Sequence, residues 1–167
     1  MDIFQYTWLW GSEESIQERY GRYKTMLYRI AFSYLHNRHD CEDVLQEAFI
    51  KLCYSAPEFP GEEDEKRWLI RVTINLCKSH LRSFWNRNRR SMDELENYAV
   101  LPQEKEELME IFALPSKYRI VIHLHYMEGY RISEIAGLLK LSISAVKMRL
   151  KRGRELLKIE LEGAHED

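Results

Sequence analysis

Glycine and proline are scarce in this chain, and their scarcity constrains the fold more than any other feature of the sequence. The 167 residues contain only 7 glycines and 4 prolines, and two of the prolines fall in the single segment 55–64. Turn-rich β folds need such residues throughout, whereas long stretches without them, rich in Leu, Ile, Glu, Arg and Lys, favour helices. The length suits one ordinary domain or two small ones. The predicted fold class is all-α.

Composition excludes several classes of protein. Charged residues make up 31% and hydrophobic residues 45% of the chain, which indicates a soluble protein with a core rather than a disordered one. No apolar run approaches the roughly 18 residues of a membrane span, and the N-terminus lacks the basic leader of a signal peptide. Three widely spaced cysteines cannot form a full disulfide framework and fit a reducing compartment. We therefore expect a cytoplasmic protein without membrane insertion.

The distribution of charge is more informative than its sum of −2. Four arginines and no acid lie between Arg82 and Arg90, and six basic residues accompany one glutamate between Lys147 and Lys158. Two separate basic patches on a nearly neutral chain favour selective contact with nucleic acid, together with acidic surfaces for partners. Taken alone, each patch could equally be a solvated helix face.

The hydrophobic periodicity predicts two helical domains joined by a linker. The segment 55–64, with its prolines and glycine, must be a loop within the first domain, and Pro115 suits a first helical position in the second. The predicted domains are 16–90 and 104–162, with 91–103 as the linker, 1–15 as an N-terminal extension and 163–167 as a tail. The predicted helices run from Ile16 to His36, Asp40 to just before Pro57, Glu65 to Asn86, Glu104 to Ala113, Pro115 to Tyr126, Ile132 to Leu139 and Ser144 to Leu161.

The segment from Arg131 to Leu157 has the layout of a helix-turn-helix, in which the second helix enters the major groove. Small Ala136 permits close helix crossing, and Ser142 suits a helix cap. The helical period places Ile143, Val146, Leu150 and Leu157 on the inner face, and Ser144, Lys147, Met148, Lys151 and Arg152 on a cationic outer face flanked by Arg149 and Arg154. The remaining alternative is a helical hairpin with a basic exposed side.

The helix predicted from Asp40 to Cys53 has an apolar face formed by Cys41, Val44, Leu45, Ala48 and Leu52. Its opposite face gathers Glu42, Asp43, Gln46, Glu47 and Ile50, with Phe49 at the border. An exposed isoleucine amid acidic and amide groups indicates a surface that docks on a basic partner. A merely solvated surface remains the alternative.

The third predicted helix has a polar stripe that contains Arg71, Asn75, Lys78, Arg82 and Arg89, with Trp68 and Trp85 near its margins. Single-stranded nucleic acid is held by cations along its backbone and by planar rings against its unstacked bases. The stripe therefore indicates strand binding. The alternative is that both tryptophans belong to the core and the stripe is solvated.

No pattern of an enzyme is present. His123 and His125 are two positions apart on a helix, so they point in different directions and cannot chelate one metal. His36, His39 and Cys41 lie close together in sequence and offer only a weak zinc candidate. The chain has no glycine-rich phosphate loop and no nucleophile motif. We expect no catalytic residue, no metal and no cofactor.

Taken in order, these segments resemble the extracytoplasmic function (ECF) sigma factors of bacterial RNA polymerase. DCEDVLQEAFIKL is similar to the helix that binds the polymerase clamp, KRWLIRVTINLCKSHLR to the helix that melts and recognises the minus-ten element, and the segment from Leu114 to Leu157 to the domain that binds the minus-thirty-five element. The resemblance covers about Glu18 to Leu161. It implies a transcription initiation factor whose partners are core RNA polymerase, promoter DNA and an anti-sigma factor.

The resemblance also implies a role for particular residues. Polymerase binding is expected at Asp40, Glu42, Asp43, Gln46, Glu47, Phe49 and Ile50. Contact with the melted minus-ten strand is expected at Trp68, Arg71, Asn75, Lys78, Ser79 and Arg82, with the loop 55–64 beside them. Contact with the minus-thirty-five duplex is expected at Ser144, Ala145, Lys147, Met148, Arg149, Lys151 and Arg152. The linker is expected to thread toward the polymerase active centre.

The chain departs from the family at four positions. Arg131 replaces the usual capping residue of the first helix of the helix-turn-helix, and Lys140 replaces the usual turn glycine, so Lys140 is expected to be left-handed. Ala145 and Met148 replace the frequent Thr and Ser, so the base preference does not carry over. Two rivals remain: a dimeric helix-turn-helix regulator that needs no polymerase, and an interaction protein that has lost DNA binding.

Overall fold

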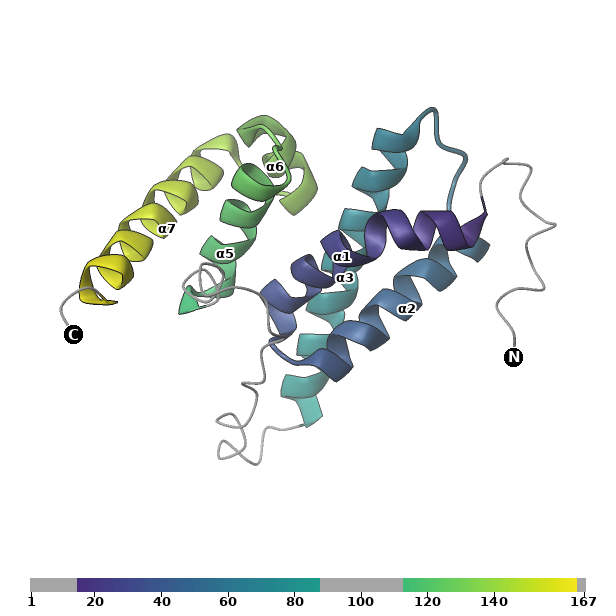
Figure 1. Ribbon diagram of the computed structural model, residues 1–167, viewed down its shortest axis with the longest axis horizontal. Helices are drawn as coiled ribbons and strands as arrows, with labels where there is room; N and C mark the ends of the chain where they lie inside the picture. The colour runs from purple at the N-terminus through teal and green to yellow at the C-terminus, as the bar shows by residue number, and fades with distance from the viewer. Residues whose placement is uncertain (1–14, 88–112, 165–167) are drawn as a thin grey trace.

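The computed structural model describes residues 15–87 and 113–164, and every element in them is helical, which confirms the predicted all-α class for this part of the chain (Figure 1). The predicted linker, the helix expected from Glu104 except its last residue Ala113, and all of the N-terminal extension except Ser15 lie outside the described residues. The elements are α1 (Ile16–Leu35), α2 (Arg38–Tyr54), α3 (Glu62–Arg87), α5 (Ser116–Ile122), the π-helix η3 (His123–Met127), α6 (Ile132–Leu139) and α7 (Ile143–Ala164).

Helices α1, α2 and α3 pack on one another and form the first domain (Figure 1). The turn between α1 and α2 is short because His36 adopts a left-handed conformation, with φ of 58°, and ends α1. The side-chain oxygen of Asn37 then accepts a hydrogen bond from the amide of Asp40 at 2.8 Å and caps α2. These local signals make α1 and α2 a hairpin whose apolar faces meet α3.

Helix α3 begins at Glu62, earlier than the predicted Glu65. Its first turn consists of acidic residues, which the positive end of the helix dipole stabilises. Two ion pairs also hold this end to α1: Arg19 lies 3.3 Å from Glu65, and Arg22 lies 3.5 Å from Glu62. The loop before α3 is therefore shorter than the sequence predicted, because α3 begins at Glu62.

The second domain begins with α5, which continues into the π-helix η3 instead of running as one regular helix to Tyr126. Pro115 is the residue before the first helical turn, not the first helical residue as predicted. The chain leaves η3 through Gly129, whose φ of 74° favours glycine, and the amide of Tyr130 returns a hydrogen bond of 2.9 Å to the carbonyl of Leu124.

Helices α6 and α7 form the predicted helix-turn-helix, and α6 has the predicted bounds. Lys140 is left-handed, with φ of 54°, as expected. Arginine has no acceptor with which to cap α6; instead the carboxylate of Glu134 accepts from the amide of Arg131 at 2.8 Å. Ser142 accepts from the amide of Ala145 at 3.1 Å, and α7 begins at Ile143, one residue earlier than predicted.

Gly153 lies where α7 packs tightly against α5. A Cβ atom added at this position would lie 2.5 Å from Cδ1 of Ile122 and 3.5 Å from Cβ of Tyr118. The lack of a side chain therefore permits the two helices to pack side by side, as Figure 1 shows. This crossing fixes the direction in which the outer face of α7 points.

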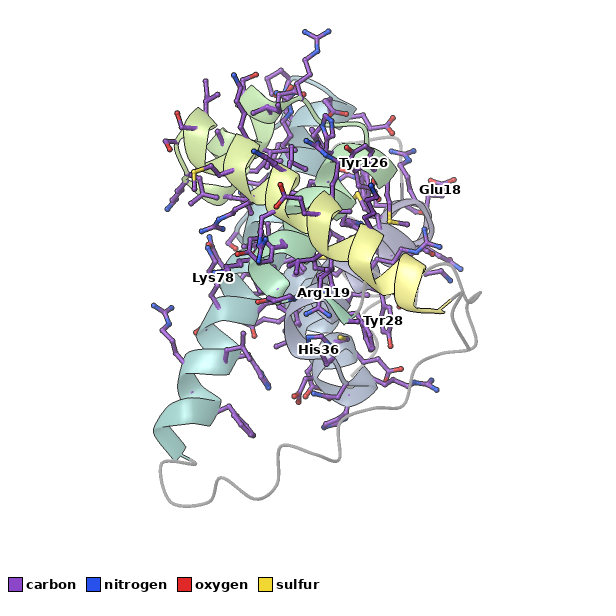
Figure 2. All side chains as sticks on the ribbon, turned by 90° about the vertical axis from the view of Figure 1, so that its left-hand side faces the viewer. Glu18, Tyr28, His36, Lys78, Arg119 and Tyr126 are labelled. Atoms are coloured by element: carbon purple, nitrogen blue, oxygen red, sulfur yellow. The ribbon has the colours of Figure 1, made fainter. Side chains whose placement is uncertain are left out.

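The two domains contact each other, which the sequence did not predict. Arg119 of α5 is 2% exposed, and its guanidinium lies against the His36 ring at the end of α1, with Nη1 3.2 Å from Nδ1 (Figure 2). At the start of α3, Arg67 pairs with Glu134 of α6 at 2.6 Å. Lys66 pairs with Glu128 at 3.6 Å. A buried cation and two interdomain ion pairs thus hold the domains together.

This contact should depend on pH through His36. Burial and the neighbouring Arg119 guanidinium lower the pKa of His36 to about 4. Separation of the domains would expose the ring and return its pKa to about 6.5. Between pH 6.5 and 4 the separated form therefore binds a proton on His36 that the closed form does not bind. Acidification from about pH 6.5 toward 4 should therefore favour separation. Small-angle scattering should show a larger radius of gyration at pH 5.5 than at pH 7.5.

The matched control for this prediction is His36→Gln, which keeps a polar group but removes the titration. Its radius of gyration should change less over the same pH interval, and circular dichroism should show that the helices persist in both proteins. An equal expansion of both proteins would assign the pH dependence to other groups.

Candidate nucleic-acid interface

The acidic face of α2 is solvent-exposed, as the sequence predicted. Glu42, Asp43, Gln46 and Glu47 all lie on it, and Ile50 beside them is 45% exposed. Within the described residues, these charges lie in local ion pairs on the same helix, such as Asp43 with His39 at 3.5 Å and Glu47 with Lys51 at 3.9 Å. Such exposed pairs separate easily, so these carboxylates are free to meet a basic partner. The sequence did not single out Tyr54, which is 63% exposed and continues the face one turn after Ile50.

Two residues assigned to this face have other surroundings. Phe49 is 7% exposed and packs edge-on against Tyr20, with ring centroids 4.8 Å apart, so it belongs to the core. The Asp40 carboxylate receives a hydrogen bond from Asn37 at 2.6 Å and lies 3.2 Å from His80 of α3. Asp40 therefore fastens the helix start to α3, and Phe49 supports the face from beneath. Their position in the sequence could not separate them from the exposed acids.

The polar stripe of α3 is also exposed. Arg71, Asn75, Lys78, Ser79 and Arg82 lie on the solvent side of the helix, and Figure 2 shows Lys78 pointing away from the body of the protein. The opposite side is buried, and it includes Ile70, Ile74 and Cys77. The stripe is thus a continuous cationic row on one long helix. Arg89 and the side chain of Trp85 lie outside the described residues.

Trp68 stands at the start of this row. Its ring is half-buried and packs edge-on against Phe59 of the loop between α2 and α3, with centroids 5.7 Å apart. The loop and the row are therefore neighbours, as a site for an unstacked base requires. Phe59 was not singled out from the sequence, although an aromatic residue between two prolines was a visible signal.

The outer face of α7 carries most of the predicted side chains in exposed positions. Ser144, Lys147, Met148, Lys151 and Arg152 are exposed, while Val146 and Leu150 are buried beneath them. Arg152 pairs with Glu155 one turn along at 3.3 Å. The arrangement offers a cationic helix of the width that a major groove admits.

Three assignments on α7 need correction or refinement. Ile143 was assigned to the inner face, but it is 50% exposed and is the first residue of α7. Ala145 and Arg149 are half-buried at the flank of the helix. Arg149 also lies near Tyr34 of α1, where its charge opposes the rise that burial causes in the tyrosine pKa. Arg149 is therefore close enough to the first domain for its charge to act on Tyr34.

Neither metal nor thiol chemistry is supported in the part of the chain that the structure describes. Those residues contain no cluster of three or more His, Cys, Asp or Glu side chains that could hold a metal ion. Burial raises the pKa of Cys41 to about 12 and also raises that of Cys77, which keeps both thiols protonated. His123, which is 4% exposed, lies 3.4 Å from Glu128, and His125 binds the carbonyl of Tyr130 at 2.9 Å. Of the described helices, none is both long and apolar enough to cross a membrane.

The chain matches two family models in the order of its domains. Residues 19–87 match Sigma-70 region 2, and residues 108–157 match Sigma-70, region 4. The first match spans α1 to α3 and therefore the acidic face and the cationic row. The second spans the described helices α5 and α6 and most of α7.

Curated relatives and solved structures agree with these matches. The chain is 30% identical over 146 residues to the RNA polymerase sigma factor SigV of Bacillus subtilis, covering 83% of this chain and 86% of the relative. It is 29% identical over 170 residues to the ECF RNA polymerase sigma factor SigW of the same species, covering 90% and 91%.

Two solved structures share the fold. The sigma factor RpoE of Bartonella quintana, in complex with the anti-sigma factor NepR, superposes with a TM-score of 0.74 at 19% identity, covering 87% of this chain and 96% of that one. CnrH, in complex with the cytosolic domain of CnrY, superposes with a TM-score of 0.62 at 22% identity, covering 92% and 91%. The chain therefore belongs to the extracytoplasmic function sigma factors of the sigma-70 family, the initiation factors of bacterial RNA polymerase.

Proposed function

We propose that this sigma factor uses three separate faces during initiation. The acidic face of α2 docks on core RNA polymerase, the cationic row of α3 captures the melted minus-ten strand, and the outer face of α7 enters the major groove of the minus-thirty-five element. The observation that carries this proposal is the row on α3. Arg71, Lys78 and Arg82 are all exposed along a helix whose other side is buried, and a regulator that binds only duplex DNA has no use for them.

Run-off transcription tests the proposal directly. Core polymerase is incubated with promoter templates, with and without the protein, and specific transcripts should appear only when the protein is present. The rival function, a helix-turn-helix regulator acting alone, predicts tight binding to duplex DNA without core polymerase and no new transcript. The acidic face of α2 argues against that rival, because a regulator that works alone does not need it.

The outer face of α7 should contain both a base-reading residue and phosphate-binding residues. Arg152→Ala should weaken binding to the upstream element by roughly 1–3 kcal/mol and relax the preference at one position. Arg154→Ala should weaken all sequences alike and reduce the salt dependence, because phosphate contacts carry no sequence information. Titrations of holoenzyme on a randomised upstream element distinguish the two classes.

Arg149→Ala belongs with the phosphate class but has a second expected effect, because Arg149 also lies near Tyr34 of the first domain. Its loss should loosen the domain contact as well as weaken DNA binding. An equal effect of Arg152→Ala on every sequence would move Arg152 to the phosphate class.

An anti-sigma factor is the third partner that we propose. RpoE and CnrH share this fold, and the first was solved with an anti-sigma factor and the second with the cytosolic domain of CnrY. We also propose that the protein works in the cytoplasm and catalyses no reaction itself, and that its domains extend over 16–90 and 104–162. Co-purification of the protein with a stoichiometric inhibitor of run-off transcription would identify such a partner.

A further inference from the structure

Met148 is the most exposed of the large apolar side chains in the described residues. It is 72% exposed, compared with 63% for Tyr54 and 50% for Ile143. A single exposed apolar residue on a surface usually has no consequence. Met148 differs from such residues because of its position on α7.

Met148 lies near the centre of the outer face of α7. It follows Ser144 by four residues and precedes Lys151 by three, so the three side chains stand on the same side of the helix. The buried residues Val146 and Leu150 lie on the opposite side. Because Ser142 caps the start of the helix, Met148 falls in the second turn, in the part of a recognition helix that reaches base edges.

The side chains around Met148 favour a polyanionic ligand. The thioether of Met148 itself favours an apolar group on that ligand. Lys147 and Lys151 on either side are exposed cations. A thioether has no hydrogen-bond donor and is only a weak acceptor, so it reads donors and acceptors of bases poorly. The major groove displays a single apolar group, the C5-methyl of thymine.

We propose that Met148 contacts the C5-methyl group of one thymine in the upstream promoter element and so favours thymine over cytosine there. The thioether side chain is unbranched and polarizable, and it can adjust to a methyl group at the floor of the groove. This inference rests on the proposed function, because it requires α7 to lie in the major groove.

An anionic membrane surface is the other ligand that cations around an apolar side chain could suit. A membrane-bound helix needs a continuous apolar face. Among the described side chains of α7, the exposed large apolar residues Ile143 and Met148 are about 140° apart around the helix, with lysines between and beside them. The distribution of side chains therefore favours DNA.

The test replaces thymine by uracil, which removes only the methyl group. An upstream element is first selected from a randomised pool with holoenzyme that contains the full chain, and each thymine on either strand is then replaced in turn. Holoenzyme with the parent chain should bind about fourfold more weakly when one particular thymine is replaced, the effect expected of one lost buried methyl group. Holoenzyme with Met148→Ala should show no difference between thymine and uracil at that position.

Three controls make the result specific. Met148→Leu keeps an apolar side chain and should retain part of the uracil effect. Met127→Ala removes an exposed methionine of η3 that is not part of the outer face of α7, and should leave the effect unchanged. A cytosine at the sensitive position should bind better when it is 5-methylcytosine. Because Met148 is exposed, circular dichroism of its variants should match the parent.

The outcomes separate this inference from the proposed function. Failure of the holoenzyme to select any upstream element would contradict the function itself. Selection of an element in which no uracil replacement matters, or in which Met148→Ala keeps the full uracil effect, would overturn only the role of Met148. Binding of the protein to phosphatidylglycerol vesicles that Met148→Ala abolishes, without any uracil effect, would assign the residue to a membrane surface.

Discussion

Holoenzyme that carries alanine at Arg71, Lys78 and Arg82 together should still bind the upstream element but should fail to open a duplex promoter. The three side chains are exposed along one side of α3, and none of them supports the core. Unpaired bases must be held against reannealing, and the phosphates of the captured strand must be neutralised. Permanganate reactivity of thymines near the start site should therefore fall to the level of core polymerase alone.

Two further measurements locate the defect in strand capture. A template with a pre-melted bubble should partly restore transcription, because the free energy of opening is already supplied. For a single-stranded minus-ten oligonucleotide, the slope of log affinity against log salt should decrease by about 2, as expected for three lost phosphate contacts. Normal opening by the triple variant would show that the cationic row is only a solvated surface.

Reversal of Asp43 and Glu47 to lysine should abolish recruitment of core polymerase without unfolding the protein. Both side chains are about half exposed, and in the described part of the chain they pair with His39 and Lys51 of the same helix. Each lost pair should cost less than about 1 kcal/mol of stability, so the melting curve should barely move. A like-charge contact with a basic partner costs far more, and the affinity for core polymerase should fall at least about tenfold.

The matched control reverses Glu58 and Asp64, two exposed acids outside α2, and changes the net charge by the same amount. Its affinity for core polymerase should stay near that of the parent, which would exclude a general effect of charge. Pull-downs with core polymerase in the absence of DNA measure both variants. A similar loss in both, or in neither, would argue against docking through the acidic face of α2.

Local signals explain why so much of the fold could be predicted from the sequence. The bounds of α6 and the left-handed conformation of Lys140 depend on residues next to them in the chain. The outer face of α7 follows from helical periodicity in the same way. The burial of Phe49 was not predictable, because it depends on Tyr20 of another helix. Ile143 was misplaced because periodicity shows on which side of a helix a residue lies but not whether another element covers it.

The contact between the domains was beyond prediction for a related reason. Arg119 reads in the sequence as an ordinary helix cation, and only its approach to His36, 83 positions earlier, makes it a buried residue. Likewise, Glu134 has a local role at the start of α6 and a distant one with Arg67. Pairings of this kind depend on how the two domains pack against each other. The periodicity of a sequence carries no information about that packing.

The closed arrangement of the domains leaves almost no spare length to span a straight promoter. The names of the two elements place them about 25 base pairs apart, or roughly 85 Å along duplex DNA. Helical rise puts Arg82 about 23 Å from Arg67, and the path from Glu134 to Arg152 is at most about 35 Å. With Arg67 and Glu134 paired at 2.6 Å, the span is reached only if both paths and all the side chains lie fully extended in one line. We therefore expect the pair to separate before both elements are bound.

Promoter strength and promoter choice are consequently set by different parts of this molecule. If the domains separate to bind both elements, every such promoter is bound by the same population of separated chains, so its apparent affinity is scaled by that one fraction. Substitutions at the Arg67–Glu134 pair should multiply the occupancy of all such promoters by a common factor and leave their rank order intact. Substitutions on α7 should reorder them. Natural variation at the domain contact would thus adjust the size of a transcriptional response without changing which genes respond.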